Sequence, residues 1–89
     1  MKEINKKLKG LRDKIDKIDN KILELLDKRF RLATATLKFK KKVAAPNREK
    51  EIISLAIKKT NELSFVEPKF ARKLISVIIS ESKRIQKLK

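Results

Sequence analysis

The sequence predicts an all-α fold in which one long N-terminal helix is followed by two shorter helices. Turn-forming residues are scarce, because the 89 residues include one Gly and two Pro. Hydrophobic residues make up 40% of the chain and aromatic residues only 4%. In three successive segments the apolar residues recur every three or four positions, which is the spacing of one helix face. A chain of this length corresponds to a single domain, residues 1–89.

The first helix is predicted from about Ile4 to Lys41. Gly10 weakens it locally, but the apolar pattern continues through that position. A helix of roughly 38 residues is about 57 Å long, whereas a compact globule of this chain length is about 30 Å across. One chain therefore cannot cover the apolar seam, and we expect two long helices to pack together in a two-fold homodimer. The seam steps by four and three positions and consists of Ile4, Leu8, Leu11, Ile15, Ile18, Ile22 and Leu25.

The second helix is predicted to begin at Pro46 or Asn47 and to end near Asn61, and the third to run from about Pro68 to Lys87. Pro46 suits the first helical turn if Ala45 is the cap, whereas Asn47 has the better capping side chain. The inner stripe of the second helix is Glu49, Ile52, Ile53, Ala56, Ile57 and Thr60. The inner stripe of the third helix is Ala71, Leu74, Ile75, Ile78, Ile79, Ser82, Ile85 and Gln86.

Composition excludes several kinds of site. The chain has no Cys and no His, so disulfides, the usual zinc and iron sites and nucleophilic triads are removed from consideration. No apolar signal segment and no stretch of membrane-spanning length is visible, so we expect a soluble cytoplasmic protein. The net charge of +15 attracts anions, which could be nucleic acid, an acidic membrane or a small polyanion.

Two cations interrupt the apolar face of the first helix. Arg29 takes the seam position after Leu25, and Lys40 is predicted to project from nearly the same face, because eleven residues make just over three turns. Arg12 precedes Arg29 by seventeen residues, which is about 25 Å along the axis with a rotation of roughly 100°. Arg12 cannot reach a pocket around Arg29 in its own chain, but in an antiparallel dimer the partner's Arg12 could do so.

Polar residues also stand in the stripes of the two shorter helices. Ser82 and Gln86 are one turn apart on the third helix, and Arg48 and Glu49 begin the second. Buried polar groups destabilise a fold unless they are partnered, so these side chains meet each other, meet water or line a cavity. Cations, a hydroxyl, an amide and a carboxylate in an apolar surround describe a pocket for a small polyanion with hydroxyl or ether oxygens.

The order and spacing of these residues resemble the all-helical class of chorismate mutases, the domain that also forms the N-terminal part of bifunctional prephenate dehydratases. Each motif is weak alone, but together they run in family order from residue 11 to residue 86. The segments that carry the resemblance are LRDKIDKIDNKILELLDKR (residues 11–29), Lys40, PNRE (residues 46–49) and IISESKRIQ (residues 78–86).

The resemblance implies the rearrangement of chorismate to prephenate, a step in phenylalanine and tyrosine synthesis. It implies an intertwined helical homodimer with two active sites, and neither a cofactor nor a metal. Many members carry Asp three residues before the Arg-Glu pair, where this chain has Ala45. We therefore expect a weaker cap on the second helix and a substrate hydroxyl contact that rests more on Glu49 and backbone.

The resemblance also implies roles for individual side chains. The two substrate carboxylates are bound by two arginines, one of them from the partner chain, with help from a hydroxyl. A lysine and an amide donate hydrogen bonds to the ether oxygen of the breaking bond, which makes them the catalytic pair. The residues concerned are Arg29, the partner's Arg12 and Ser82 at the carboxylates, Lys40 and Gln86 at the ether oxygen, Glu49 at the ring hydroxyl and Arg48 in the lining.

Three other interpretations stay open. Isochorismate-pyruvate lyase uses the same fold and a similar set of cations on an isomeric substrate, and sequence separates the two poorly. A basic helical dimer that binds nucleic acid is disfavoured, because Tyr and Trp are absent and the basic residues do not cluster in one arm. A bare coiled-coil module would not need Arg29 or Gln86 in its apolar stripes. The sequence thus favours a small-molecule substrate and a homodimer, with no nucleic acid or membrane as partner.

Overall fold

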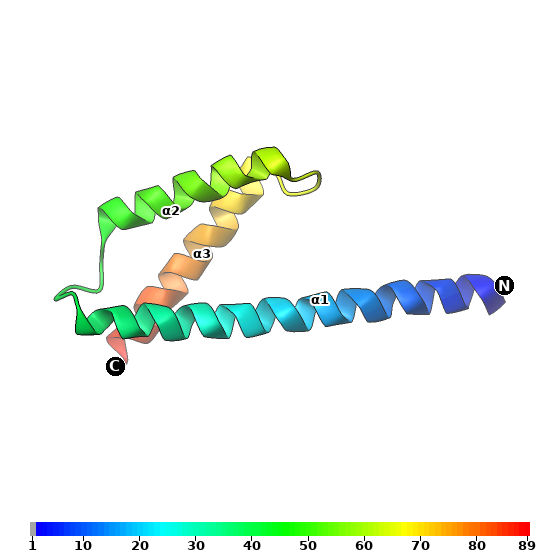
Figure 1. The fold of residues 1–89 in the computed structure, drawn as a ribbon, viewed down its shortest axis with the longest axis horizontal. Helices are drawn as coiled ribbons and strands as arrows, with labels where there is room; N and C mark the ends of the chain where they lie inside the picture. The colour runs from blue at the N-terminus through cyan, green and yellow to red at the C-terminus, as the bar shows by residue number, and fades with distance from the viewer. Residues whose placement is uncertain (1) are drawn as a thin grey trace. The chain divides into compact units, whose positions relative to one another are not determined.

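The computed structural model describes residues 2–89, which form helices joined by short connections (Figure 1). No strand occurs among these residues, so the predicted all-α class with three main helices is confirmed. Both shorter helices begin at a proline, as expected for the first helical turn. The elements are α1 (Lys2–Ala35), η1 (Thr36–Lys38), α2 (Pro46–Lys59), η2 (Thr60–Glu62) and α3 (Pro68–Lys87).

The described chain divides into two compact units. The first ends at Leu32 and contains most of α1, and the second comprises Ala33–Lys89. The second unit therefore holds the last turn of α1, both 3₁₀ turns, α2 and α3. Within residues 2–89, no helix combines the length and the apolar character that a membrane crossing requires.

The first helix ends earlier than the sequence predicts. It becomes a 3₁₀ turn after Ala35, so Lys40 lies in the connection to α2, not on a helix. The predicted end at Lys41 was wrong, and so was the placement of Lys40 on one helical face with Arg29. The Thr36 hydroxyl donates to the Ala33 carbonyl at 2.6 Å, and the Phe39 N–H donates to the Thr36 carbonyl at 2.9 Å. Such local hydrogen bonds compete with the α-helical pattern and tighten the chain into 3₁₀ geometry.

The apolar seam of α1 is exposed in the single chain. Ile15, Ile18 and Ile22 are 54%, 59% and 49% exposed, and the other seam residues are exposed as well. Covering aliphatic surface is favourable by roughly 25 cal/mol per Å², so this face gains stability from any complementary apolar surface that covers it.

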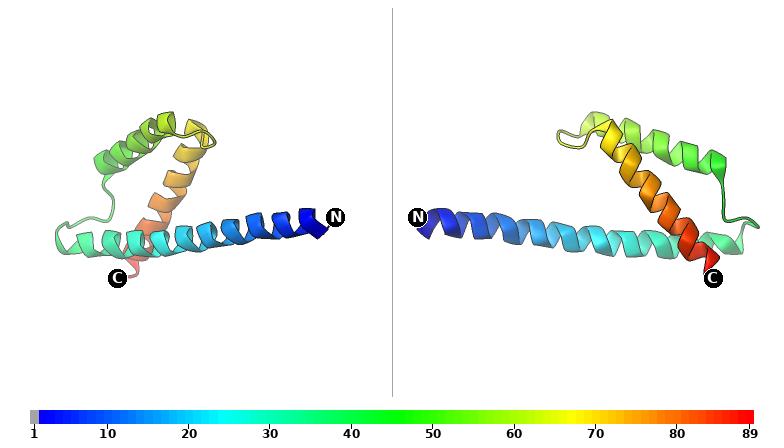
Figure 2. Two further views of the ribbon diagram at one scale, coloured as in Figure 1. Left: turned by 45° about the vertical axis from the view of Figure 1, so that its right-hand side comes forward. Right: turned by 180° about the vertical axis from the view of Figure 1, so that it is seen from behind.

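Within the second unit, α2 and α3 pack against each other and run in opposite directions from the connection at residues 63–67 (Figures 1 and 2). The stripe predicted for α2 is confirmed, because its residues are partly buried and Thr60, which follows in η2, is buried. On α3, Leu74 is an exception to the predicted stripe, since it is 44% exposed. Leu74 lies at the edge of the stripe, rotated away from its centre. The buried residues of α3 are Ala71, Ile79, Ser82 and Gln86.

Candidate active site

Glu49 is held from two sides at the start of α2. Ala45 is the cap residue and offers no capping side chain, and Pro46 takes the first helical position. The Glu49 carboxylate reaches back to that cap, and its Oε2 accepts a hydrogen bond from the Ala45 N–H at 3.2 Å. From α3, the Lys83 ammonium donates to Oε1 of the same carboxylate at 3.1 Å. Each carboxylate oxygen keeps a further lone pair, so Glu49 can still accept a hydrogen bond from a ligand.

The surroundings of Glu49 favour its charged form. The hydrogen bond from Lys83 lowers the pKa of the Glu49 carboxyl most, followed by the bond from the Ala45 backbone. Desolvation raises this pKa, but the positive charges of Lys83 and Lys40 add to the lowering, and the net direction is downward. Glu49 is therefore a fixed hydrogen-bond acceptor at neutral pH.

Lys40 is positioned by its own connection, not by a helix. Its ammonium donates to the Val43 carbonyl at 3.0 Å, and the side chain is partly buried. Because an ammonium carries three N–H groups, this bond leaves donors for a ligand. The positive charge of Lys40 also contributes, less than Lys83 and the Ala45 backbone do, to the lowered pKa of Glu49.

Gln86 and Ser82 are buried on the inner face of α3, with exposures of 5% and 7%. The Gln86 Nε2 donates to the Ala33 carbonyl at 2.7 Å. That carbonyl lies in the last turn of α1, where helix geometry provides no backbone N–H partner. It also accepts the Thr36 hydroxyl, so the end of the helix is satisfied by two side chains. One amide N–H of Gln86 is thus used for orientation, and the second can serve a ligand.

Of the other three predicted residues, one lies in the second unit and two lie in the first. Arg48 is exposed and forms an ion pair with Glu51, one turn further along α2. Arg12 and Arg29 both lie on α1 within the first unit. The second unit thus contains Lys40, Arg48 and Glu49, and it buries Ser82 and Gln86 one turn apart on α3.

Lys83 is the polar neighbour that sequence reasoning missed. It follows Ser82 directly and lies at the edge of the buried stripe, where its side chain is 34% exposed. The sequence gives one faint signal: Lys83 stands four residues after Ile79 and three before Gln86, so it borders the inner face. Because Lys occurs on every segment of this chain, that signal is not distinctive.

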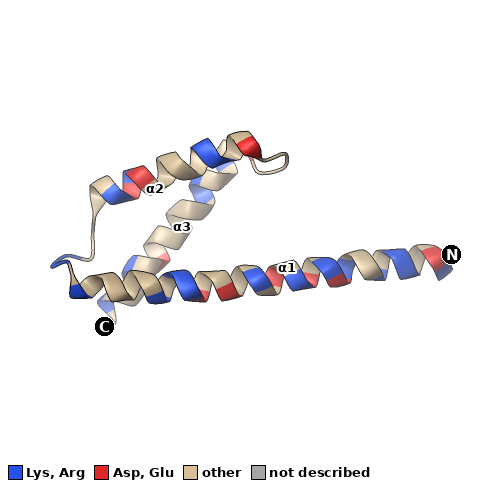
Figure 3. Cartoon of the chain, in the orientation of Figure 1, with Lys and Arg blue, Asp and Glu red and all other residues tan. Residues whose placement is uncertain are grey.

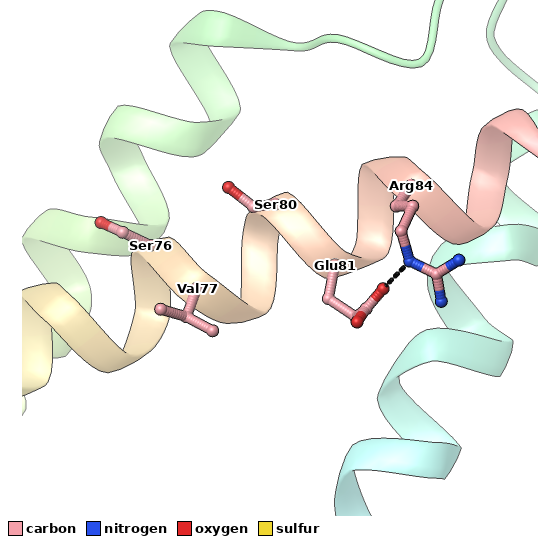
Figure 4. Close-up of a pocket in the computed structure, with 5 residues that line it drawn as sticks. All are labelled: Ser76, Val77, Ser80, Glu81 and Arg84. Carbon is pink, nitrogen blue, oxygen red and sulfur yellow. Dashed lines mark hydrogen bonds and ion pairs between the residues drawn. The ribbon is translucent and has the colours of Figure 1, made fainter.

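The structure also contains surface cavities away from these residues. One, of about 410 Å³, lies along the exposed side of α3 (Figure 4). There Glu81 and Arg84 point toward each other and form an ion pair. None of the predicted site residues lines this cavity, so it is not the candidate site. Its lining residues are Ser76, Val77, Ser80, Glu81 and Arg84.

Charge is distributed broadly over the fold. Lys and Arg occur on all three helices, and Asp and Glu alternate with them along α1 (Figure 3). Within residues 2–89, no three acidic side chains gather in a way that could hold a metal ion. The group in the second unit that can bind a ligand thus consists of lysine, amide, hydroxyl and carboxylate groups, which bind by hydrogen bonds and charge.

Comparison with known proteins assigns the chain to a family. Residues 11–87 match the family described as chorismate mutase type II. A protein of Methanocaldococcus jannaschii named chorismate mutase is 35% identical over 85 residues, which cover 91% of this chain and 85% of that protein. No solved structure matches the chain. Because the family match spans most of α1 together with α2 and α3, the chain belongs to the chorismate mutase type II family, whose members are isomerases.

Proposed function

We propose that this protein rearranges chorismate to prephenate, a step in phenylalanine and tyrosine synthesis. The observation that carries the proposal is the family match over residues 11–87, because every position with an expected role lies inside it. The arrangement of the second unit supports it, since Glu49 is held in its charged form by Lys83 and the Ala45 backbone and Gln86 is oriented by a hydrogen bond. We propose further that both units belong to one catalytic domain.

The proposed reaction suits the residue types in the chain. A Claisen rearrangement breaks a C–O bond and forms a C–C bond within one molecule, and it requires no nucleophile, general base or cofactor. The enzyme has to hold the flexible enolpyruvyl arm over the ring. Anchoring two carboxylates with separate cations achieves this, and positioning of this kind supplies a large part of many rate enhancements.

Lys40 and Gln86 are the proposed donors to the ether oxygen. Negative charge develops on this oxygen as the C–O bond stretches, so donors fixed beside it stabilise the transition state more than the substrate. The Gln86 amide is held by Ala33, and Lys40 by the Val43 carbonyl. Both donors are therefore restricted before the substrate arrives, which reduces the reorganisation needed during the reaction.

The remaining proposed contacts fix the substrate in place. Glu49 accepts a hydrogen bond from the ring hydroxyl, for which its ionised state is suited. Arg29 and the partner's Arg12 bind the two carboxylates, and Ser82 assists at one of them. Arg48 lines the site, which requires it to leave its exposed ion pair with Glu51, and such pairs contribute little stability.

The site is proposed to need two chains. The exposed apolar seam of α1 supports a homodimer in which the long helices are intertwined. The alternating three- and four-residue steps of that seam suit packing against a second helix. In such a dimer each α1 contributes Arg29 to one site and Arg12 to the other.

The direct test is an assay with purified protein. Chorismate should be consumed, with loss of its diene absorbance and appearance of prephenate. Isochorismate is supplied in a parallel reaction to test the related lyase activity. Faster formation of salicylate and pyruvate from isochorismate would reject the mutase assignment in favour of the lyase, and no reaction with either substrate would reject both.

A further inference from the structure

We propose that Lys83 is a positioning residue of the chorismate site: it pairs with Glu49 from α3, fixes the carboxylate and offsets its negative charge beside a dianionic substrate. The proposal rests on the proposed function for its kinetic consequences. The pairing itself is a property of the folded chain and can be measured without substrate.

The Lys83–Glu49 pair differs from surface ion pairs of the same chain. It joins residues 34 positions apart on two packed helices, at 3.1 Å, and the side chains are only 34% and 24% exposed. By contrast, Lys9 and Asp13 are one turn apart on a single helix, with side chains 77% and 56% exposed. Partial burial reduces screening by water and salt, so the pair between the helices is the stronger constraint.

The charges around Glu49 give Lys83 a distinct task. A bare carboxylate would repel the two carboxylates of chorismate, since like charges in a shared site disfavour each other. Lys83 and Lys40 are the cations that lower its pKa, and Arg48 is its neighbour in the sequence. Arg48, on the same helix, is paired with Glu51, and Lys40 is the proposed donor to the ether oxygen. Lys83 compensates Glu49 and thereby leaves Lys40 available to the substrate.

The cap of α2 makes this pairing more important in this chain. Ala45 provides only its backbone N–H, which binds Oε2 of Glu49, and it has no side chain that could share the contact with the ring hydroxyl. The orientation of one carboxylate therefore depends on two partners, the Ala45 N–H and the Lys83 ammonium. Without Lys83 the Oε1 side of the carboxylate would be free to rotate away from the hydroxyl.

The test compares Lys83→Met with Lys83→Arg and with the control Lys73→Met. Lys73 is an exposed lysine of α3, and Lys73→Met changes the net charge of the protein by the same amount as Lys83→Met does. We expect Lys83→Met to raise KM for chorismate about tenfold, with a smaller change in kcat, since interacting residues commonly couple at this level. Lys83→Arg keeps the charge and should restore most of the affinity, and Lys73→Met should behave as wild type.

A second pair of variants separates positioning from direct substrate contact. In a Glu49→Gln background no carboxylate charge remains to be offset, so Lys83→Met should cost less than about twofold there. An equal loss in both backgrounds would show that Lys83 contacts substrate itself, and the proposal would be overturned. It would also be overturned if Lys83→Met left KM unchanged in the wild-type background.

A measurement without substrate separates this proposal from the assignment of the reaction. NMR titration of the Glu49 side-chain carboxyl should show a higher pKa in Lys83→Met than in the wild-type protein. Lys83→Gln is prepared as a second neutral variant in case Lys83→Met does not fold. An unshifted carboxyl pKa, or failure of both neutral variants to fold, would refute the positioning role, whatever the chorismate assay shows.

Discussion

Gln86 shows how a polar side chain can be buried on an aliphatic helix face. Its amide binds the Ala33 carbonyl, which lies in the last turn of α1, where helices have carbonyls left over for other donors. Among residues 2–89, every buried side-chain nitrogen or oxygen has a hydrogen-bond partner. Ser82 and Gln86 are therefore compatible with burial on an apolar helix face. They are also proposed to contact the substrate.

The donors at the ether oxygen give the first prediction. Replacing Lys40 or Gln86 by Ala should lower kcat for chorismate by about 10²–10³, because each removes a donor that is most valuable in the transition state. Lys41→Ala, at the next and exposed position, is the matched control and should retain activity. Circular dichroism verifies that the variants fold. Wild-type turnover by folded Lys40→Ala and Gln86→Ala would remove both residues from the proposed mechanism.

The second prediction concerns pH and the pairing of Glu49. Because the pKa of Glu49 is lowered in the folded protein, the unfolded chain takes up this proton at a higher pH than the folded chain does. The stabilisation from Glu49 is therefore fully present above the unfolded pKa and is lost as pH falls through the lower folded pKa. Urea unfolding of wild type and Glu49→Gln should show a stability difference at pH 7 that shrinks in acid. A difference that is constant with pH would contradict the pairing.

For individual residues, the sequence pattern predicted the buried polar side chains better than it predicted the charged side chain beside them. Ser82 and Gln86 stand out because every other residue of their stripe is apolar. Lys83 does not stand out, because lysines are numerous on all three helices. The pairing of Lys83 with Glu49 could not be predicted either, because the contact between α2 and α3 depends on their packing angle and not on residue spacing within one helix.

Among the elements, the two shorter helices were predictable and the end of the first was not. Pro46 and Pro68 mark helix starts because proline fits the first turn and cannot continue a preceding helix. After Ala35, by contrast, no proline or glycine marks the boundary, and Leu37 continues the apolar spacing. At this boundary the Thr36 hydroxyl donates a hydrogen bond to the Ala33 carbonyl, and the periodicity of apolar residues does not predict such a bond.

The start of α2 gives the third prediction. Ala45→Asp introduces a capping side chain where Ala45 offers none, and it should stabilise the protein by about 1 kcal/mol. Lys40 and Lys83 lie near Glu49 and should offset the added negative charge. Ala44→Asp adds the same charge one residue earlier and is the control. If chemical denaturation finds Ala45→Asp no more stable than Ala44→Asp, the cap of α2 is not a weak point.

For the whole molecule, the exposed seam of α1 is the strongest structural indication of a second chain. The fourth prediction is that the protein sediments with twice the chain mass and that Ile18→Asp shifts it toward monomer. Ile18 is 59% exposed in the single chain, and an interfacial carboxylate would be desolvated without a partner. Lys17→Asp, next to it and outside the seam, is the control. Unchanged association of Ile18→Asp in analytical ultracentrifugation would place the interface elsewhere.

The proposal that Arg12 and Arg29 of different chains serve one site goes beyond what a single sequence can establish. Helical spacing shows that Arg12 and Arg29 are about 25 Å apart along α1, so they cannot serve one site within one chain. Which surfaces meet in the dimer depends on packing between chains, which periodicity does not encode. The sequence thus predicted the all-α fold with three main helices, whereas the residues of the site and its sharing between two chains stay predictions.

Subunit complementation tests that shared site most directly. Arg12→Ala and Arg29→Ala should each abolish chorismate turnover, because every site in either homodimer lacks one cation. In a mixed dimer, one site combines an intact Arg29 with the partner's Arg12, and the other site lacks both cations. Equal mixing with free exchange makes half of the dimers mixed, so about a quarter of wild-type activity should return. No recovery, despite exchange verified by mass spectrometry of differently tagged chains, would contradict a site shared between two chains.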